Sequence, residues 1–118
     1  MSDELLRARL GHILTAIAAI RRYVADKNLE EFTNDRQLID AVERNIERVS
    51  EASRHLPEEL KTGFSYIPWR EIAGIGNVLR HDYPSILPRE IWATVTGDLP
   101  ELEAAVSAMI EEIEAKRE

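Results

Sequence analysis

The sequence predicts an all-α fold, an antiparallel bundle of four to five helices. Apolar residues recur at spacings of three and four along several segments, which is the pattern of helices that bury one face. No segment alternates apolar and polar residues with β-branched side chains, so we expect no strand. The length of 118 residues, without an internal repeat or linker, favours a single domain over residues 1–118.

The first two long helices follow from apolar stripes and a capping pattern. We expect one helix over residues 3–26 and a short turn or helical piece over residues 29–32. Asn34 is the predicted N-cap of the second long helix, and Gln37 is its capping-box partner. This helix should end near His55, because a proline follows two residues later.

Prolines set the bounds of a third helix. Residues 57–67 read as a connector that includes a short turn. Pro68 suits the first residue of a helix, where its missing N–H costs nothing. Pro84 disfavours helical geometry at Tyr83, so the third helix should end there.

Two further helices complete the predicted bundle. A short helix is expected over residues 89–96, and Gly97 should end it. Asp98 is then expected to cap the last helix, with Glu101 as its capping-box partner.

Composition excludes several kinds of site. The chain has no cysteine, which rules out disulfides, thiolate zinc sites, iron–sulfur clusters and cysteine nucleophiles. Its start is acidic and lacks the basic region of a signal peptide. No apolar run reaches the roughly 20 residues that span a bilayer. We therefore expect a cytoplasmic protein that does not bind membranes.

The formal net charge of −7 argues against binding nucleic acid through bulk positive charge, yet this charge is unevenly distributed. Residues 64–92 contain three arginines and three acidic residues, so this segment is neutral. It also holds five of the seven aromatic residues and three of the five prolines. Functional groups concentrate in such irregular segments on rigid supports.

Four chemically complementary residues lie close together in this segment. Asn77 and His81 are four residues apart, which places them on one face of a helix. Arg80 is adjacent to His81 but points about 100° away, and Tyr83 follows. Imidazole moves protons near neutral pH, and guanidinium holds phosphate. These groups would suffice for metal-free RNA cleavage, with His81 taking the proton of the ribose 2′-OH.

A simpler interpretation of His81 stays open at this point. A histidine near the C-terminus of a helix often stabilises the helix dipole. Asn77 is equally compatible with a surface amide bonded to water, with orienting His81 or with holding RNA.

The chain resembles the HepT-like toxins, a branch of the HEPN superfamily. The core signature is matched by residues 67–83, IPWREIAGIGNVLRHDY. Residues 9–14 and 40–47 resemble the first two helices of the family, and Trp92 and residues 98–102 resemble its tail. The resemblance covers nearly the whole chain, with the motifs in the family's order.

This resemblance implies a HEPN-like helical domain that forms homodimers and acts as a toxin beside a minimal nucleotidyltransferase antitoxin. The implied activity is metal-independent endoribonuclease cleavage of RNA, without a cofactor. The family motif is an arginine, four intervening residues, a histidine, one residue and a tyrosine, and His81 and Tyr83 match its histidine and tyrosine. The antitoxin is implied to neutralise the toxin by transferring AMP to Tyr83. The arginine of the motif falls at Gly76. Either Arg80 takes its role or catalysis is weakened, and in the latter case the domain would be a module that binds its partner without cleaving RNA.

Two arginines and two glycines nearby complete the set of candidate residues. Arg70 and Arg89 are candidate contacts for RNA phosphates. Gly74 and Gly76 fail the dinucleotide-binding pattern because no strand precedes them. Two glycines inside a helix cost on the order of 1 kcal/mol each, so we expect close helix approach there, within the chain or across a dimer interface.

The tryptophans and remaining histidines are predicted to be structural. Trp69 and Trp92 are expected in the core, although stacking on bases would also suit them. His12 and His55 have no partners at metal-ligand spacing and are predicted to be structural or surface residues.

Overall fold

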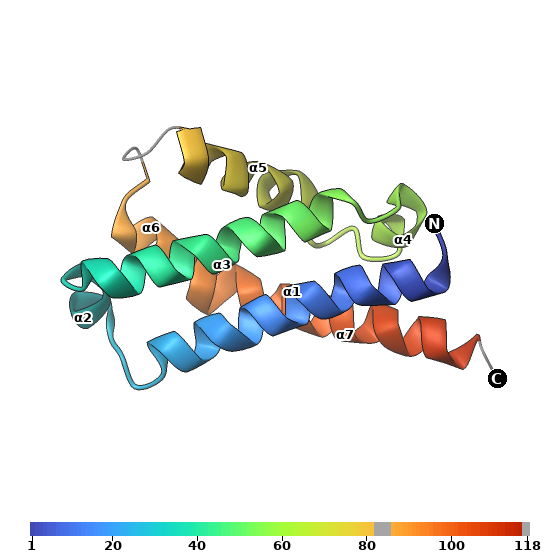
Figure 1. Cartoon of the computed structure of the whole chain (residues 1–118), viewed down its shortest axis with the longest axis horizontal. Helices are drawn as coiled ribbons and strands as arrows, with labels where there is room; N and C mark the ends of the chain where they lie inside the picture. The colour runs from blue at the N-terminus through green and yellow to red at the C-terminus, as the bar shows by residue number, and fades with distance from the viewer. Residues whose placement is uncertain (82–85, 117–118) are drawn as a thin grey trace.

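Four long helices lie side by side in the computed structural model, each antiparallel to the next along the chain (Figure 1). The structure describes residues 1–81 and 86–116. The long helices are α1 (Asp3–Val24), α3 (Arg36–Arg54), α5 (Trp69–His81) and α7 (Leu99–Ala115). Helix α3 lies between α1 and α5, and α7 packs on the other side of α1. The described residues contain no strand, so the predicted all-α bundle is confirmed.

Three short helices connect the long ones within the described part of the chain. Helix α2 (Leu29–Thr33) precedes α3, α4 (Glu58–Thr62) lies in the connector, and α6 (Pro88–Ala93) leads toward α7. The predicted short pieces at residues 29–32 and in the connector are therefore confirmed. Helix α5 continues through His81, and its predicted end near Tyr83 falls outside the described residues.

The core is made by the predicted apolar stripes. The most deeply buried side chains of the long helices include Leu10, Ile13 and Ile20 of α1, Ile39, Val42, Ile46 and Val49 of α3, and Leu102, Val106 and Met109 of α7. Full burial of each such side chain stabilises the fold by about 1.5–3 kcal/mol. The bundle is therefore a rigid support for α5.

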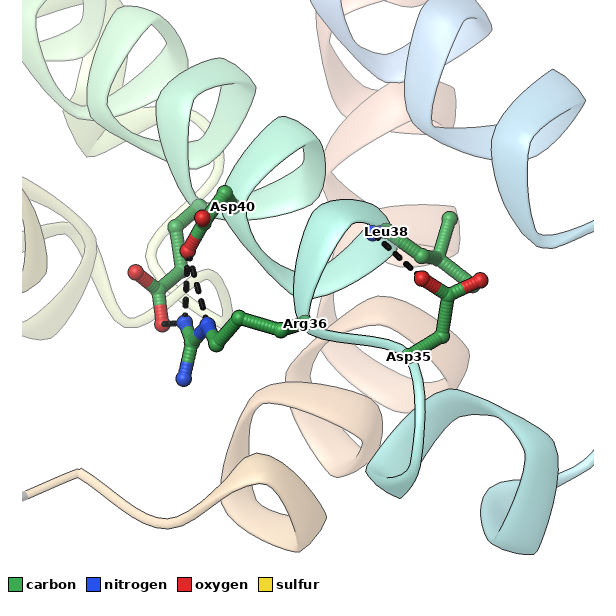
Figure 2. A network of polar contacts seen from close by, with 5 residues as sticks. Asp35, Arg36, Leu38 and Asp40 are labelled. Carbon is green, nitrogen blue, oxygen red and sulfur yellow. Dashed lines mark hydrogen bonds and ion pairs between the residues drawn. The ribbon is translucent and has the colours of Figure 1, made fainter.

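The predicted cap of α3 was wrong by one residue. Asp35 is the N-cap, and its carboxylate accepts a hydrogen bond from the Leu38 N–H at 3.0 Å (Figure 2). Asn34 ends α2 instead, donating from its side chain to the Glu30 carbonyl at 2.9 Å. Since α3 starts one residue later, Gln37 does not sit at the capping-box position.

The predicted break at Gly97 was also wrong. Helical geometry continues from α6 through a π-helical turn, η1 (Thr94–Asp98), directly into α7. Asp98 makes no capping hydrogen bond with its side chain, because no free helix start exists there. Such π turns absorb an extra residue within a helix, so the glycine does not terminate it.

An ionic cluster lies at the start of α3. Arg36 pairs with Asp40 at 2.7 Å (Figure 2) and with Glu43 at 3.4 Å. The Glu43 side chain is only 12% exposed, and its burial raises the pKa of this carboxyl. The folded state therefore binds this proton more tightly than the unfolded state. The contribution of Glu43 to the free energy of unfolding rises as pH falls through the raised pKa.

No helix within the described residues is both long and apolar enough to cross a membrane.

Candidate functional site

Helix α5 packs one face against α3. Ile72, Gly76 and Leu79 are buried on this face. The tightest point is at Gly76, whose N–H donates to the Ser50 hydroxyl at 3.1 Å. That hydroxyl donates in turn to the Ala73 carbonyl at 2.9 Å. Ser50 is itself buried, so one side chain of α3 joins two turns of α5.

The contact at Gly76 leaves no space for a side chain. A Cβ atom built there would lie 2.6 Å from the Ser50 Oγ atom and 2.8 Å from its Cβ atom. Separations this short do not occur between real Cβ atoms and their neighbours. The position where the motif places arginine therefore faces the interior, and close helix approach is confirmed as the role of Gly76. Gly74 differs, because a Cβ atom there meets nothing within 4 Å.

The opposite face of α5 is exposed and carries the predicted catalytic residues. Arg70, Gly74, Asn77 and His81 follow one another at spacings of three and four, and all four are exposed. Neither Asn77 nor His81 has a side-chain hydrogen bond to another described residue. The His81 imidazole is thus accessible to a substrate, whereas a buried structural histidine would be fully bonded.

Arg80 points to a different surface from His81. Its side chain lines a groove of about 610 Å³ that runs between α1 and α3, here called the α1–α3 groove. Among the described residues, the basic lining consists of Arg9, His12, Arg44, Arg48, His55 and Arg80. The acidic lining is Glu47 and Glu51. With neutral histidines, these residues give a formal excess of two positive charges in a chain of net charge −7.

Several contacts hold the groove in shape. Arg9 donates to the backbone carbonyl of His55 at 3.2 Å, which ties α1 to the end of α3. Arg48 donates to the Asn45 side chain at 3.2 Å. The His55 ring lies 3.2 Å from the Glu51 carboxylate. Hydrogen bonds to neighbouring residues therefore hold side chains in place on both walls of the groove, on α1 and on α3.

The predicted phosphate contacts Arg70 and Arg89 lie apart from this groove. Arg70 lines a separate hollow of about 480 Å³ with Arg54 and Lys61, beside the Trp69 ring. Arg89 is exposed on α6 and has no ion pair with another described residue. The structure thus brings Arg80, but neither of these two arginines, together with the basic residues of α1 and α3.

Both tryptophans belong to the core, as predicted. Trp69 is half-buried, and its indole N–H donates to the Phe64 carbonyl at 3.0 Å. The Trp92 ring packs against Phe32, with the ring centroids 5.2 Å apart. Tyr83 lies outside the described residues. No cluster of three or more potential metal ligands occurs within residues 1–81 and 86–116.

Sequence reasoning missed the other basic residues of the α1–α3 groove. Arg9 and His12 are three residues apart on α1, and Arg44 and Arg48 are four apart on α3. These spacings place each pair on one helix face. The signal was present, but nothing in the sequence indicated that the two faces would meet beside Arg80.

The sequence matches the family model described as "HepT-like: Ribonuclease HepT-like" over residues 13–109. It is 35% identical over 105 residues to "Putative RNase TTE0752" of Caldanaerobacter subterraneus, covering 89% of this chain and 94% of that protein. It is 36% identical over 93 residues to "Probable ribonuclease HepT" of Thermococcus cleftensis, covering 79% and 84%.

A third similar protein is longer. The chain is 33% identical over 108 residues to "Gamma-glutamylcyclotransferase and putative RNase MJ0434" of Methanocaldococcus jannaschii. The match covers 92% of this chain and 49% of that protein, so the chain spans about half its length. No solved structure gives a significant match.

Proposed function

This chain belongs to the HepT-like ribonuclease family of the HEPN superfamily, and we propose that it is a toxin that cleaves RNA without a metal ion. The observation that carries the proposal is the exposed His81 at the end of α5, one turn beyond Asn77 and adjacent to Arg80. An accessible imidazole can move a proton, and the guanidinium of the preceding residue can hold the phosphate from the side of the α1–α3 groove.

The reaction follows from these groups. His81 accepts the proton of the ribose 2′-OH, and the 2′-oxygen attacks the adjacent phosphorus. The bond from phosphorus to the 5′-oxygen breaks, and this oxygen takes a proton from the imidazolium or from water. The products are a 2′,3′-cyclic phosphate and a 5′-hydroxyl. Asn77, on the same face, orients the imidazole or the substrate.

Arg80 is the guanidinium available for the phosphate, since Gly76 has no side chain and no space for one. It stabilises negative charge on the phosphate from the side of the α1–α3 groove. Guanidinium geometry matters at such sites, so this placement is an arrangement distinct from the family motif.

The proposal predicts that the purified, unmodified protein cleaves single-stranded RNA in the presence of EDTA. Cleavage should persist because the base and the group that holds the phosphate are protein side chains, and the nucleophile is the 2′-OH of the RNA itself. The measurement is gel analysis of a labelled RNA, with product ends identified by phosphatase and kinase treatment. Loss of cleavage in EDTA, restored by a divalent metal, would show that the metal-free mechanism is wrong.

We further propose that the protein is a homodimer neutralised by a minimal nucleotidyltransferase through AMP transfer to Tyr83. The family supports this proposal, as does the exposed stripe of α5, where Gly74 leaves open space for a second chain to approach.

Co-expression with such a nucleotidyltransferase should increase the intact mass of the protein by AMP units. The Tyr83→Phe variant should show no increase, because it lacks the phenol oxygen that attacks the α-phosphate of ATP and displaces pyrophosphate. An unchanged mass of the parent protein, beside a nucleotidyltransferase shown to be active, contradicts this role.

A second candidate function is a binding module that does not cleave RNA. The observation that favours it is at Gly76, where the motif has an arginine and this protein has no space for a side chain. In that case the purified protein is inactive on RNA in EDTA and with metals, while it still binds its nucleotidyltransferase partner.

A further inference from the structure

None of the four arginines of the α1–α3 groove forms an ion pair with a carboxylate among the described residues. Arg9 and Arg48 donate only to neutral oxygens, the His55 carbonyl and the Asn45 amide. Arg44 and Arg80 have no hydrogen bond or ion pair to another described residue.

Three other arginines of the chain pair with carboxylates. Arg7 pairs with Glu114 at 2.5 Å, Arg21 pairs with Glu103, and Arg36 pairs with Asp40. The charge of each of these three side chains is balanced by an ion pair within the protein. Guanidiniums without ion pairs, which outnumber the two carboxylates of the same hollow in an acidic protein, are instead available for an external anion.

The shape of the groove favours an extended ligand. From Arg44 to His55 the lining follows three turns of α3, which is about 16 Å at about 1.5 Å per residue. That length accommodates several consecutive nucleotides of one strand. Leu5, 46% exposed at the groove, offers an apolar surface for a base or sugar.

The position of the groove favours RNA over other polyanions. Arg80 lines the groove, and the next residue in the chain is His81. A strand held along the groove therefore passes the last turn of α5, which carries the imidazole about 100° around the helix from Arg80. This choice of ligand rests on the proposed ribonuclease function.

We propose that the α1–α3 groove binds the phosphate backbone of single-stranded RNA and leads the strand to His81. Arg44, Arg48 and Arg80 contact consecutive phosphates, and Arg9 and His12 line the opposite wall. This binding is separate from the chemistry at His81, so the two are testable independently.

The test measures RNA binding in a chain that does not cleave. A fluorescein-labelled single-stranded RNA of about 12 nucleotides is titrated with the full-length His81→Asn variant, and anisotropy is recorded at several KCl concentrations. Adding Arg44→Ala should weaken binding by roughly three- to tenfold and reduce the magnitude of the slope of log K against log salt by about 0.7. Arg44 has no partner among the described residues, so its loss should leave the fold intact.

The matched control is Arg22→Ala in the same background. Arg22 is also exposed on the described surface and without a partner there, and it lies ten residues beyond the groove on α1. The substitution changes the net charge equally. It should change RNA affinity less than twofold.

Three results would overturn the proposal. The first is equal weakening by Arg44→Ala and Arg22→Ala, which means that only total charge matters. The second is competition by polyglutamate or by AMP as effective as competition by unlabelled RNA, which points to an acidic protein segment or a single nucleotide. The third is that Arg44→Ala changes the sedimentation coefficient of the protein, while its RNA affinity equals that of the Arg22→Ala control. This result would mean that the groove is an interface between protein chains.

The two proposals fail in different ways. If the parent protein does not cleave RNA but Arg44→Ala still weakens binding selectively, the ribonuclease function fails and the groove stands. If the parent protein cleaves RNA and Arg44→Ala matches its control, the function stands and the groove fails.

Discussion

The His81→Ala variant is expected to lose RNA cleavage by roughly 10²- to 10⁴-fold, the usual contribution of a positioned acid–base group. The reason is that the 2′-OH of ribose is a weak nucleophile until a base removes its proton. His81 is exposed and has no side-chain partner among the described residues. Its replacement should therefore change the free energy of unfolding by no more than about 0.5 kcal/mol. The measurement is the initial cleavage rate in EDTA, with thermal unfolding recorded for the same samples.

Two controls separate proton transfer from structure. His81→Asn keeps a polar side chain but has no titrating group near neutral pH, so it should be as inactive as the alanine variant. Free imidazole added to His81→Ala should restore part of the rate, because it supplies the missing base. Cleavage by His81→Ala at the parent rate would show that His81 does not take the proton. If the variants are inactive and unfolded, and imidazole does not restore their activity, His81 has a structural role.

Gly76→Ala is expected to destabilise the fold by about 1–3 kcal/mol, the cost of overpacking a filled interior. The added Cβ atom would lie 2.6 Å from the Ser50 Oγ atom. Ser50 is only 1% exposed, and its hydroxyl is committed to the Ala73 carbonyl. Moving the hydroxyl away would break that hydrogen bond, so α5 and α3 must separate instead. Urea or thermal unfolding measures the loss.

Gly11→Ala is the matched control, since Gly11 also lies within a helix and a Cβ atom there meets nothing within 4 Å. It should stabilise the protein by up to about 1 kcal/mol through the higher helix propensity of alanine. Ser50→Gly removes both close atoms, so in this background Gly76→Ala should lose most of its cost. If Gly76→Ala is as well tolerated as Gly11→Ala, the helices are not in contact at this point.

The same contact decides what restoring the motif would do. Gly76→Arg places a long side chain where a single methyl group does not fit. We expect it to destabilise the protein more than Gly76→Ala rather than to improve catalysis. The family arginine cannot be restored by one substitution, because Ser50 of α3 leaves no space for a side chain at this position.

The caps show where local patterns were insufficient. Asn34 and Asp35 are both good N-caps and stand side by side. Which of them starts α3 depends on how far α2 extends, and α2 takes Asn34 for its own end. Likewise, Gly97 is a common helix terminator in isolation. It is tolerated inside η1, where Val95 and Leu99 on either side of it are buried in the core.

The sequence by itself determined the all-α class, the long helices, the family and the candidate residues Asn77 and His81. The class, the helices and the shared face of Asn77 and His81 depend on spacing along one segment, because helical periodicity places residues three or four apart on one face. The family depends on motifs spread along the chain. Only the tertiary structure decided that Ser50 fills the space beside Gly76 and that Arg80 lines the same groove as the basic residues of α1 and α3. Both depend on how closely separate helices approach and at which rotation, and these contacts join residues more than 20 positions apart in the chain.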